Sequence, residues 1–110
     1  HDPTIGDRRC HCVFAALRDK NSAAMVALLR PCITRFHPAV LQIERSCCAD
    51  DLARLCPDAL PHQNVTDALT AAWVDAKKDG GFVLVTGSLF LIAETFSILG
   101  DHYLDPPVAF

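Results

Sequence analysis

The alternation of apolar and polar positions is clearest near the carboxyl end of the chain. Residues 82–85 read FVLV, an unbroken apolar run that is typical of a strand covered on both faces. Gly87 ends this strand and permits a tight turn, and Ser88 is a suitable N-cap residue for a helix. Because residues 89–99 are apolar nearly all round, we expect a largely buried helix there, ending at Gly100.

The same alternation of strand and helix patterns extends through the rest of the chain. Further strands are predicted at residues 12–17, 32–36 and 62–65. Further helices are predicted at residues 23–30, 50–56 and 67–78. Residues 37–46 read as a loop with some extended structure, and residues 101–110 as a tail. Strands that alternate with helices at this spacing predict the α/β class: a small, doubly wound, mostly parallel sheet with helices on both faces.

Two of these helices have a predicted inward face. In the helix over 23–30 this face is formed by Met25, Leu28 and Leu29. For the helix over 67–78 we expect Thr66 as the N-cap residue. Its apolar residues share one side, which we expect to pack against the sheet: Val65, Leu69, Ala72, Trp73 and Ala76.

Length and composition fit a single domain over residues 1–110. The 110 residues are 51% apolar, which is enough for a hydrophobic core. The formal net charge is −3 and no basic block is present, which argues against nucleic acid as a partner. No apolar run reaches the roughly 18–20 residues that a membrane-spanning helix needs. We expect a domain without nucleic-acid or membrane partners, and we expect it to be a monomer.

The cysteines and histidines do not form a recognisable framework. An even number of cysteines can indicate disulfides, but disulfide scaffolds usually lack the core that this composition supports. We expect reduced cysteines in a cytoplasmic protein, with Cys12 and Cys32 as small apolar residues of strands. Cys10-His11-Cys12 lacks standard zinc spacing and a second ligand pair, so no metal site is predicted. We expect each histidine at the surface or in a loop: His1, His11, His37, His62 and His102.

Candidate chemistry is confined to the residues that follow two predicted strands. The chain has no GxGxxG or GxxxxGK[ST] sequence and so no nucleotide-phosphate loop of its own. Asp19-Lys20 follows the first strand, and Gly87-Ser88 follows the last. In a parallel sheet both turns open at the same edge, where the Lys20 cation and the donors at Ser88 could hold a carboxylate. The alternative is an ordinary capped turn at Gly87-Ser88 and a solvated turn lysine.

Residues 16–21, ALRDKN, and residues 82–94, FVLVTGSLFLIAE, also carry a family resemblance. The first segment resembles the GVLxDKD turn of folylpolyglutamate synthases and the related dihydrofolate synthases. The second resembles their vLVTGSLylvgE segment. His1-Asp2-Pro3 is similar to the family's DGAHNP motif, with Asp2 in place of asparagine. The resemblance covers roughly residues 12–100.

The resemblance implies the C-terminal, Rossmann-like domain of a ligase of the Mur superfamily. Such an enzyme uses ATP and Mg²⁺ to add L-glutamate to folate through an acyl phosphate. The resemblance implies a glutamate site formed by Lys20, Gly87, Ser88 and Asp19, with Asp19 as a turn or orienting residue of that site. It also implies that His1 lies near the nucleotide. ATP, Mg²⁺ and folate would be held mainly by an N-terminal domain of the same protein, which this chain does not contain. The 110 residues alone are therefore expected to be inactive.

Two other functions remain open at this stage. A Mur-type cell-wall amino-acid ligase shares the C-terminal fold and a comparable lysine and serine, although the VTGSLF sequence favours the folate branch. A non-catalytic α/β binding module would have the fold without a ligase domain upstream. A GxxxxGK[ST] loop encoded some hundreds of residues before His1 would favour a ligase over the module.

Overall fold

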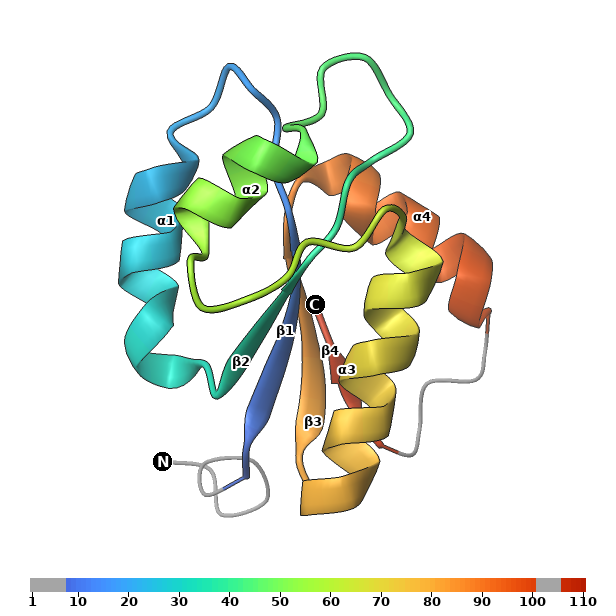
Figure 1. Cartoon of the computed structure of the whole chain (residues 1–110). Helices are drawn as coiled ribbons and strands as arrows, with labels where there is room; N and C mark the ends of the chain where they lie inside the picture. Colours follow the sequence, from blue (N-terminus) through green and yellow to red (C-terminus); the bar gives the residue numbers. More distant parts are fainter. Residues whose placement is uncertain (1–7, 101–105) are drawn as a thin grey trace.

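The centre of the molecule is a four-stranded parallel sheet. The computed structural model describes residues 8–100 and 106–110. Within that part the strand order is β2-β1-β3-β4, and every neighbouring pair is parallel (Figure 1). The strands are β1 (Cys10–Ala15), β2 (Arg35–Pro38), β3 (Phe82–Gly87) and β4 (Val108–Ala109). The helices are α1 (Ser22–Leu29), α2 (Ala49–Leu55), α3 (Val65–Asp79) and α4 (Leu89–Leu99), with a 3₁₀ turn at Arg30–Cys32.

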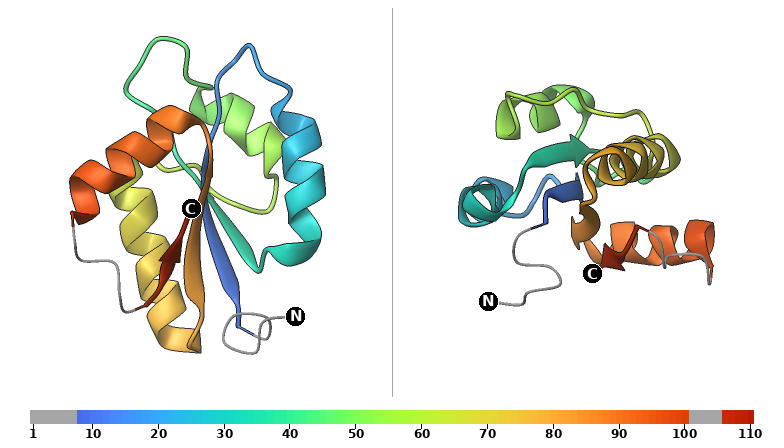
Figure 2. Two further views of the ribbon diagram at one scale, coloured as in Figure 1. Left: turned by 180° about the vertical axis from the view of Figure 1, so that it is seen from behind. Right: turned by 90° about the horizontal axis from the view of Figure 1, so that it is seen from below.

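Helices cover both faces of this sheet, so the predicted fold class is confirmed. Side chains of β1 alternate between two apolar cores, as the two-residue period of a strand requires. Val13 packs with residues of α3 and α4, whereas Phe14 packs with residues of α1 and α2. Figure 2 shows the two pairs of helices on opposite sides of the strands. Phe14 is fully buried at the centre, where truncation of a phenylalanine to alanine costs about 3–5 kcal/mol.

The first two strands are displaced from their predicted positions. The strand predicted at 12–17 runs from Cys10 to Ala15, and the strand predicted at 32–36 runs from Arg35 to Pro38. The second shift arises because α1 continues into the 3₁₀ turn that includes Pro31, so Cys32 is an exposed turn residue and not part of a strand. Pro38 is tolerated in β2 because this strand forms an edge of the sheet.

Two helix details also differ from the prediction. The inward residues of α1 are Ser22 and Val26, whereas Leu28, predicted on the inward face, is 81% exposed. Helix α3 begins at Val65, two residues earlier than predicted, because Asn64 and not Thr66 is the N-cap residue: the Asn64 side chain accepts a hydrogen bond from the Asp67 N–H. The strand predicted at 62–65 is reduced to one parallel bridge between Ala39 and His62.

The carboxyl-terminal part of the chain differs more from its predicted structure. Residues 101–110 were expected to form a tail, but β4 pairs with β3, with Val108 opposite Val83. Helix α4 has its predicted bounds and is less buried than expected, since its buried side chains are Leu91 and Thr95 while Leu89 is 80% exposed. The helix touches the sheet with one side, so its other apolar side chains face outward.

The cysteines are free thiols in this structure. Cys32 and Cys48 are exposed, and the other four are buried. Burial raises the pKa of the Cys10 and Cys56 thiols to about 11, so these thiols stay protonated near neutral pH. Among the helices in residues 8–100 and 106–110, none combines the length and apolar character needed to cross a membrane.

Candidate functional site

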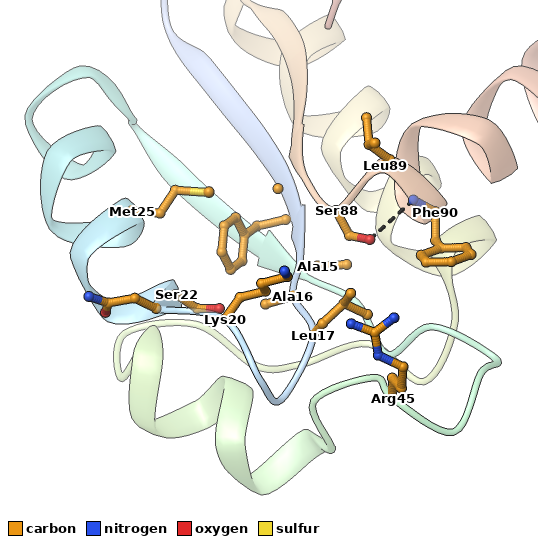
Figure 3. Close-up of a pocket in the computed structure, with 13 residues that line it drawn as sticks. Ala15, Ala16, Leu17, Lys20, Ser22, Met25, Arg45, Ser88, Leu89 and Phe90 are labelled. Carbon is orange, nitrogen blue, oxygen red and sulfur yellow. Dashed lines mark hydrogen bonds between the residues drawn. The ribbon is translucent and has the colours of Figure 1, made fainter.

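A pocket opens at the carboxyl edge of the sheet, between β1, α1 and the turn that leads from β3 into α4 (Figure 3). Its volume is about 520 Å³. We call it the carboxyl-edge pocket, and it is lined by Phe14, Ala15, Ala16, Leu17, Lys20, Asn21, Ser22, Met25, Arg45, Gly87, Ser88, Leu89 and Phe90. Three residues singled out from the sequence, Lys20, Gly87 and Ser88, therefore lie around one cavity.

The turn from β3 into α4 has a backbone that only glycine can supply. Gly87 has φ +118°, and a Cβ atom there would lie 2.2 Å from the carbonyl oxygen of Ala15. The same carbonyl accepts a hydrogen bond of 3.0 Å from the Ser88 N–H. The Ser88 hydroxyl in turn accepts from the Phe90 N–H at 3.1 Å. Close contact between β3 and β1 thus directs the amino terminus of α4, the positive end of its dipole, toward the pocket.

Lys20 reaches the pocket from the turn between β1 and α1. The turn is closed by a hydrogen bond of 3.3 Å from the Lys20 N–H to the Leu17 carbonyl. Asn21 then caps α1, since its side chain accepts from the Ala24 N–H. Lys20 is exposed, and in Figure 3 its ammonium group lies above the end of β1.

Arg45 is a second cation at the pocket, and nothing in the local sequence indicated it. The chain after β2 runs back beside the end of β1, where Ser46 pairs with Leu17 and the Cys47 N–H donates to the Ala16 carbonyl at 2.9 Å. This pairing brings the Arg45 side chain to the pocket rim. Only tertiary structure places it there.

Asp19 does not line the pocket. Its carboxylate accepts a hydrogen bond of 2.8 Å from Arg45, and this contact lowers the pKa of Asp19 below its usual value. Both side chains are more than half exposed, so the pair adds little to stability. The contact joins Asp19 to the Arg45 guanidinium at the rim of the pocket.

The lining of the pocket suits an anion with an apolar part. Lys20 and Arg45 carry positive charge, the amino terminus of α4 adds to it, and Phe14, Met25 and Phe90 supply apolar surface. No carboxylate is among the lining residues, so the pocket does not fit a magnesium ion, which prefers carboxylate oxygens. The predicted nucleotide contact, His1, lies outside the described residues and stays a prediction.

Comparison with known proteins tests the resemblance. No protein-family model matches the chain, and a search of curated proteins finds no match either. Solved structures do match it. A bifunctional folylpolyglutamate synthase/dihydrofolate synthase from Yersinia pestis, complexed with AMPPNP and Mn, is 27% identical with a TM-score of 0.76, over 84% of this chain and 22% of that chain. The chain resembles one domain of the folate ligases.

Further structures agree. FolC from Escherichia coli, in complex with DHPP and ADP, is 28% identical with a TM-score of 0.78, over 86% of this chain and 22% of that chain. Folylpolyglutamate synthase from Mycobacterium tuberculosis, complexed with ADP, is 20% identical with a TM-score of 0.73, over 89% of this chain and 25% of that chain, and shows the fold alone. The predicted resemblance is confirmed, and the chain spans about a quarter or less of the length of these proteins.

Proposed function

We propose that this chain is the C-terminal, glutamate-binding domain of an ATP-dependent ligase that adds L-glutamate to folate. The observation that carries the proposal is the convergence of Lys20, Arg45 and the amino terminus of α4 on one pocket. A further support is a bifunctional folylpolyglutamate synthase/dihydrofolate synthase structure with Mn, AMPPNP and L-glutamate bound. It is 26% identical with a TM-score of 0.76, over 88% of this chain and 23% of that chain.

The proposed role of the chain is to position the amino acid. Glutamate carries two carboxylates, and two separated cations on one pocket match that charge pattern. Lys20 would contact one carboxylate and Arg45 the other, while Ser88 and the α4 terminus supply hydrogen-bond donors. Gly87, which has no side chain, would let the substrate approach the backbone of this turn closely. Held in this way, the amino group of glutamate would be presented to the activated folate, which is catalysis by proximity.

The remaining parts of the reaction belong to a separate domain in this proposal. The chain has no phosphate-loop sequence, and its pocket does not suit Mg²⁺, so ATP and Mg²⁺ would be bound mainly by an N-terminal domain of the same protein. This chain would close over that domain during turnover. A monomeric, cytoplasmic enzyme with folate, glutamate and ATP as its small-molecule partners completes the proposal.

The test is ligation by the full-length protein. With a folate, Mg-ATP and labelled glutamate, we expect incorporation of label into the folate, dependent on ATP. Labelling of a cell-wall precursor in place of folate would favour the Mur-type ligase. Failure to ligate any amino acid to either acceptor, by a protein that is folded, would favour a non-catalytic binding module.

A further inference from the structure

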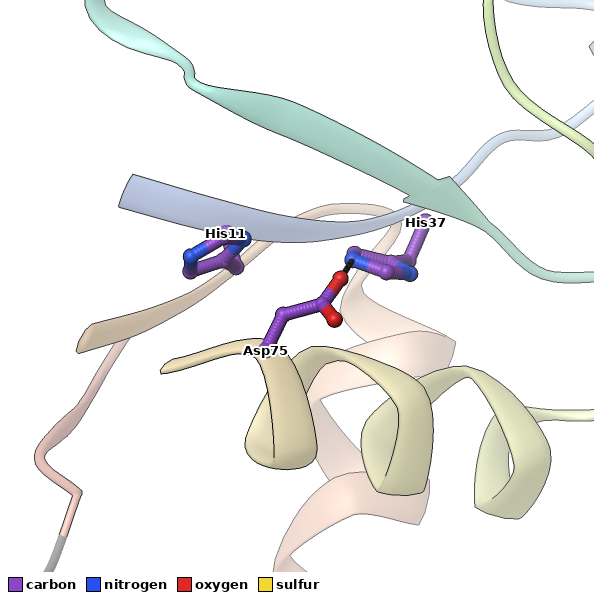
Figure 4. A group of neighbouring side chains, drawn as sticks. All are labelled: His11, His37 and Asp75. Atoms are coloured by element: carbon purple, nitrogen blue, oxygen red, sulfur yellow. Dashed lines mark ion pairs between the residues drawn. The ribbon is translucent and has the colours of Figure 1, made fainter. Parts of the chain in front are cut away.

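Two histidines expected at the surface are buried beside each other on the α3 face of the sheet. His11 is 3% exposed and His37 is 5% exposed. His37 on β2 pairs with Val13 on β1, two positions beyond His11, so both imidazoles point to the same face. Asp75 approaches them from α3, as Figure 4 shows. We call His11, His37 and Asp75 the histidine cluster.

Each histidine of the cluster has one buried ring nitrogen without a hydrogen-bond partner among the described residues. These atoms are His11 Nδ1 and His37 Nε2, the second of which lies 3.3 Å from Oδ2 of Asp75 but not in hydrogen-bonding geometry. The other nitrogen of His11, Nε2, lies 2.7 Å from Oδ2 of Asp79. A carboxylate can only accept, so Nε2 carries the proton and, in the neutral ring, Nδ1 has a free lone pair. Buried polar atoms without a partner are rare, because each costs about 1–3 kcal/mol.

We propose that the histidine cluster binds a divalent transition-metal ion, with zinc as the ion that the donor set suits best. One ligand atom from each of the three residues lies within 4.8 Å of the other two. Two imidazoles and one carboxylate form a recurrent protein zinc set, with a fourth position left for water. A tetrahedral ion with bonds of about 2.0 Å holds its ligands about 3.3 Å apart, so the three side chains move together on binding.

The surroundings of the cluster fit this assignment. Asp79 would orient His11 from outside the coordination sphere, the arrangement that fixes many metal-binding imidazoles. His37 Nε2 is already 3.3 Å from Asp75 Oδ2. Arg35 now lies 3.5 Å from the same carboxylate oxygen, but its side chain is 65% exposed and can turn into solvent. The ion would replace this weak contact.

The site is accessible and separate from the carboxyl-edge pocket. A surface cavity of about 590 Å³ is lined in part by His37 and Asp75, and another of about 330 Å³ by His11, Asp75 and Asp79. Neither cavity shares a lining residue with the carboxyl-edge pocket. A bound ion would link β1, β2 and α3, so its effect would be on stability and not on the amino-acid site.

The experiment is zinc titration of the protein in a Cys32→Ser/Cys48→Ser background, which removes the two exposed thiols as competing ligands. Isothermal titration calorimetry gives the dissociation constant, and the melting temperature with and without zinc gives the linked stabilisation. Cobalt in place of zinc reports the ligand type, since thiolate ligands add strong near-ultraviolet absorption that nitrogen and oxygen ligands lack.

The decisive variants are Asp75→Asn and, as a matched control, Asp58→Asn, an exposed aspartate that lines the same cavity outside the cluster. We expect zinc to raise the melting temperature of the parent and of Asp58→Asn. Affinity should fall about 10- to 100-fold or more in Asp75→Asn, and by a similar factor in Asp79→Asn. His37→Gln removes a second proposed ligand, at a buried position, and should also weaken zinc binding.

Three outcomes would overturn the proposal. The first is that the Cys32→Ser/Cys48→Ser protein binds no zinc at millimolar concentration. The second is equal affinity in Asp75→Asn and Asp58→Asn. The third is a cobalt spectrum dominated by thiolate absorption, which would assign the ion to buried cysteines. Circular dichroism of each variant separates lost binding from lost folding.

Discussion

The carboxyl-edge pocket and the histidine cluster are both polar features of one small sheet, but they differ in charge and in origin. The pocket carries two exposed cations, Lys20 and Arg45. The two imidazoles of the cluster are buried, and desolvation lowers the pKa of His37 to about 4, so this ring is neutral near neutral pH. An exposed pair of cations suits a charged substrate that binds and leaves, whereas buried imidazoles suit a structural role.

The two regions also depend on different parts of the chain. Most of the pocket comes from the ends of β1 and β3 and the residues that follow them, where the backbone fixes their position. The cluster depends on the register of β1 against β2 and on where α3 lies over them. Changes at the pocket should therefore alter substrate use while leaving the cluster unaffected.

The largest expected effect is at the turn that forms the pocket's floor. Gly87→Ala places a Cβ atom against the Ala15 carbonyl and keeps φ at +118°, so we expect a loss of about 3 kcal/mol or more in the free energy of unfolding. Gly80→Ala is the matched control, with φ +69° and no atom near the new Cβ, and should lose about 1 kcal/mol. Urea denaturation measures both, and equal losses would show that the close approach to Ala15 is unimportant.

A smaller effect is expected at Arg45, the pocket residue that the sequence did not reveal. Arg45→Ala removes a charge-assisted contact from a half-exposed side chain, so we expect the KM for glutamate in the full-length ligase to rise about tenfold. Arg54→Ala, at an exposed arginine of α2 that does not line the carboxyl-edge pocket, should leave the KM unchanged. The same tenfold rise in both variants would mean a general charge effect and not a site.

Ser88→Ala should have an effect between threefold and tenfold on kcat/KM for glutamate. The substitution removes one neutral hydrogen bond to the substrate and the cap on the Phe90 N–H, which together contribute about 1 kcal/mol. The shape of the side chain changes little. Ser88→Thr keeps the hydroxyl and should retain most of the activity. Parental kinetics in Ser88→Ala would limit the role of this residue to the helix cap.

The smallest effect is expected at Asp19. Because its carboxylate contacts Arg45 and does not line the pocket, Asp19→Asn should change the KM for glutamate by about threefold or less. Steady-state kinetics with glutamate as the varied substrate decides this. A loss of tenfold or more would place Asp19 in direct contact with the substrate, contrary to its position in the structure.

Sequence patterns predicted what depends on neighbouring residues. The β3–α4 unit has its predicted bounds because FVLV, Gly87 and Ser88 specify a buried strand, a turn and a cap in succession. Arg45 could not be predicted, since it reaches the pocket only through the pairing of Leu17 with Ser46. The histidine cluster was missed for the same reason, because periodicity does not show which residue of β2 lies beside β1.

The central claim is that the carboxyl-edge pocket binds glutamate through Lys20. The direct measurement is steady-state kinetics of the full-length ligase with Lys20→Ala and, as a control, Lys77→Ala at an exposed position of α3. We expect Lys20→Ala to weaken glutamate use about 10- to 100-fold, to change the KM for ATP far less, and to leave folding intact. Glutamate kinetics within about twofold of the parent and of Lys77→Ala would make Lys20 a solvated turn lysine and contradict the claim.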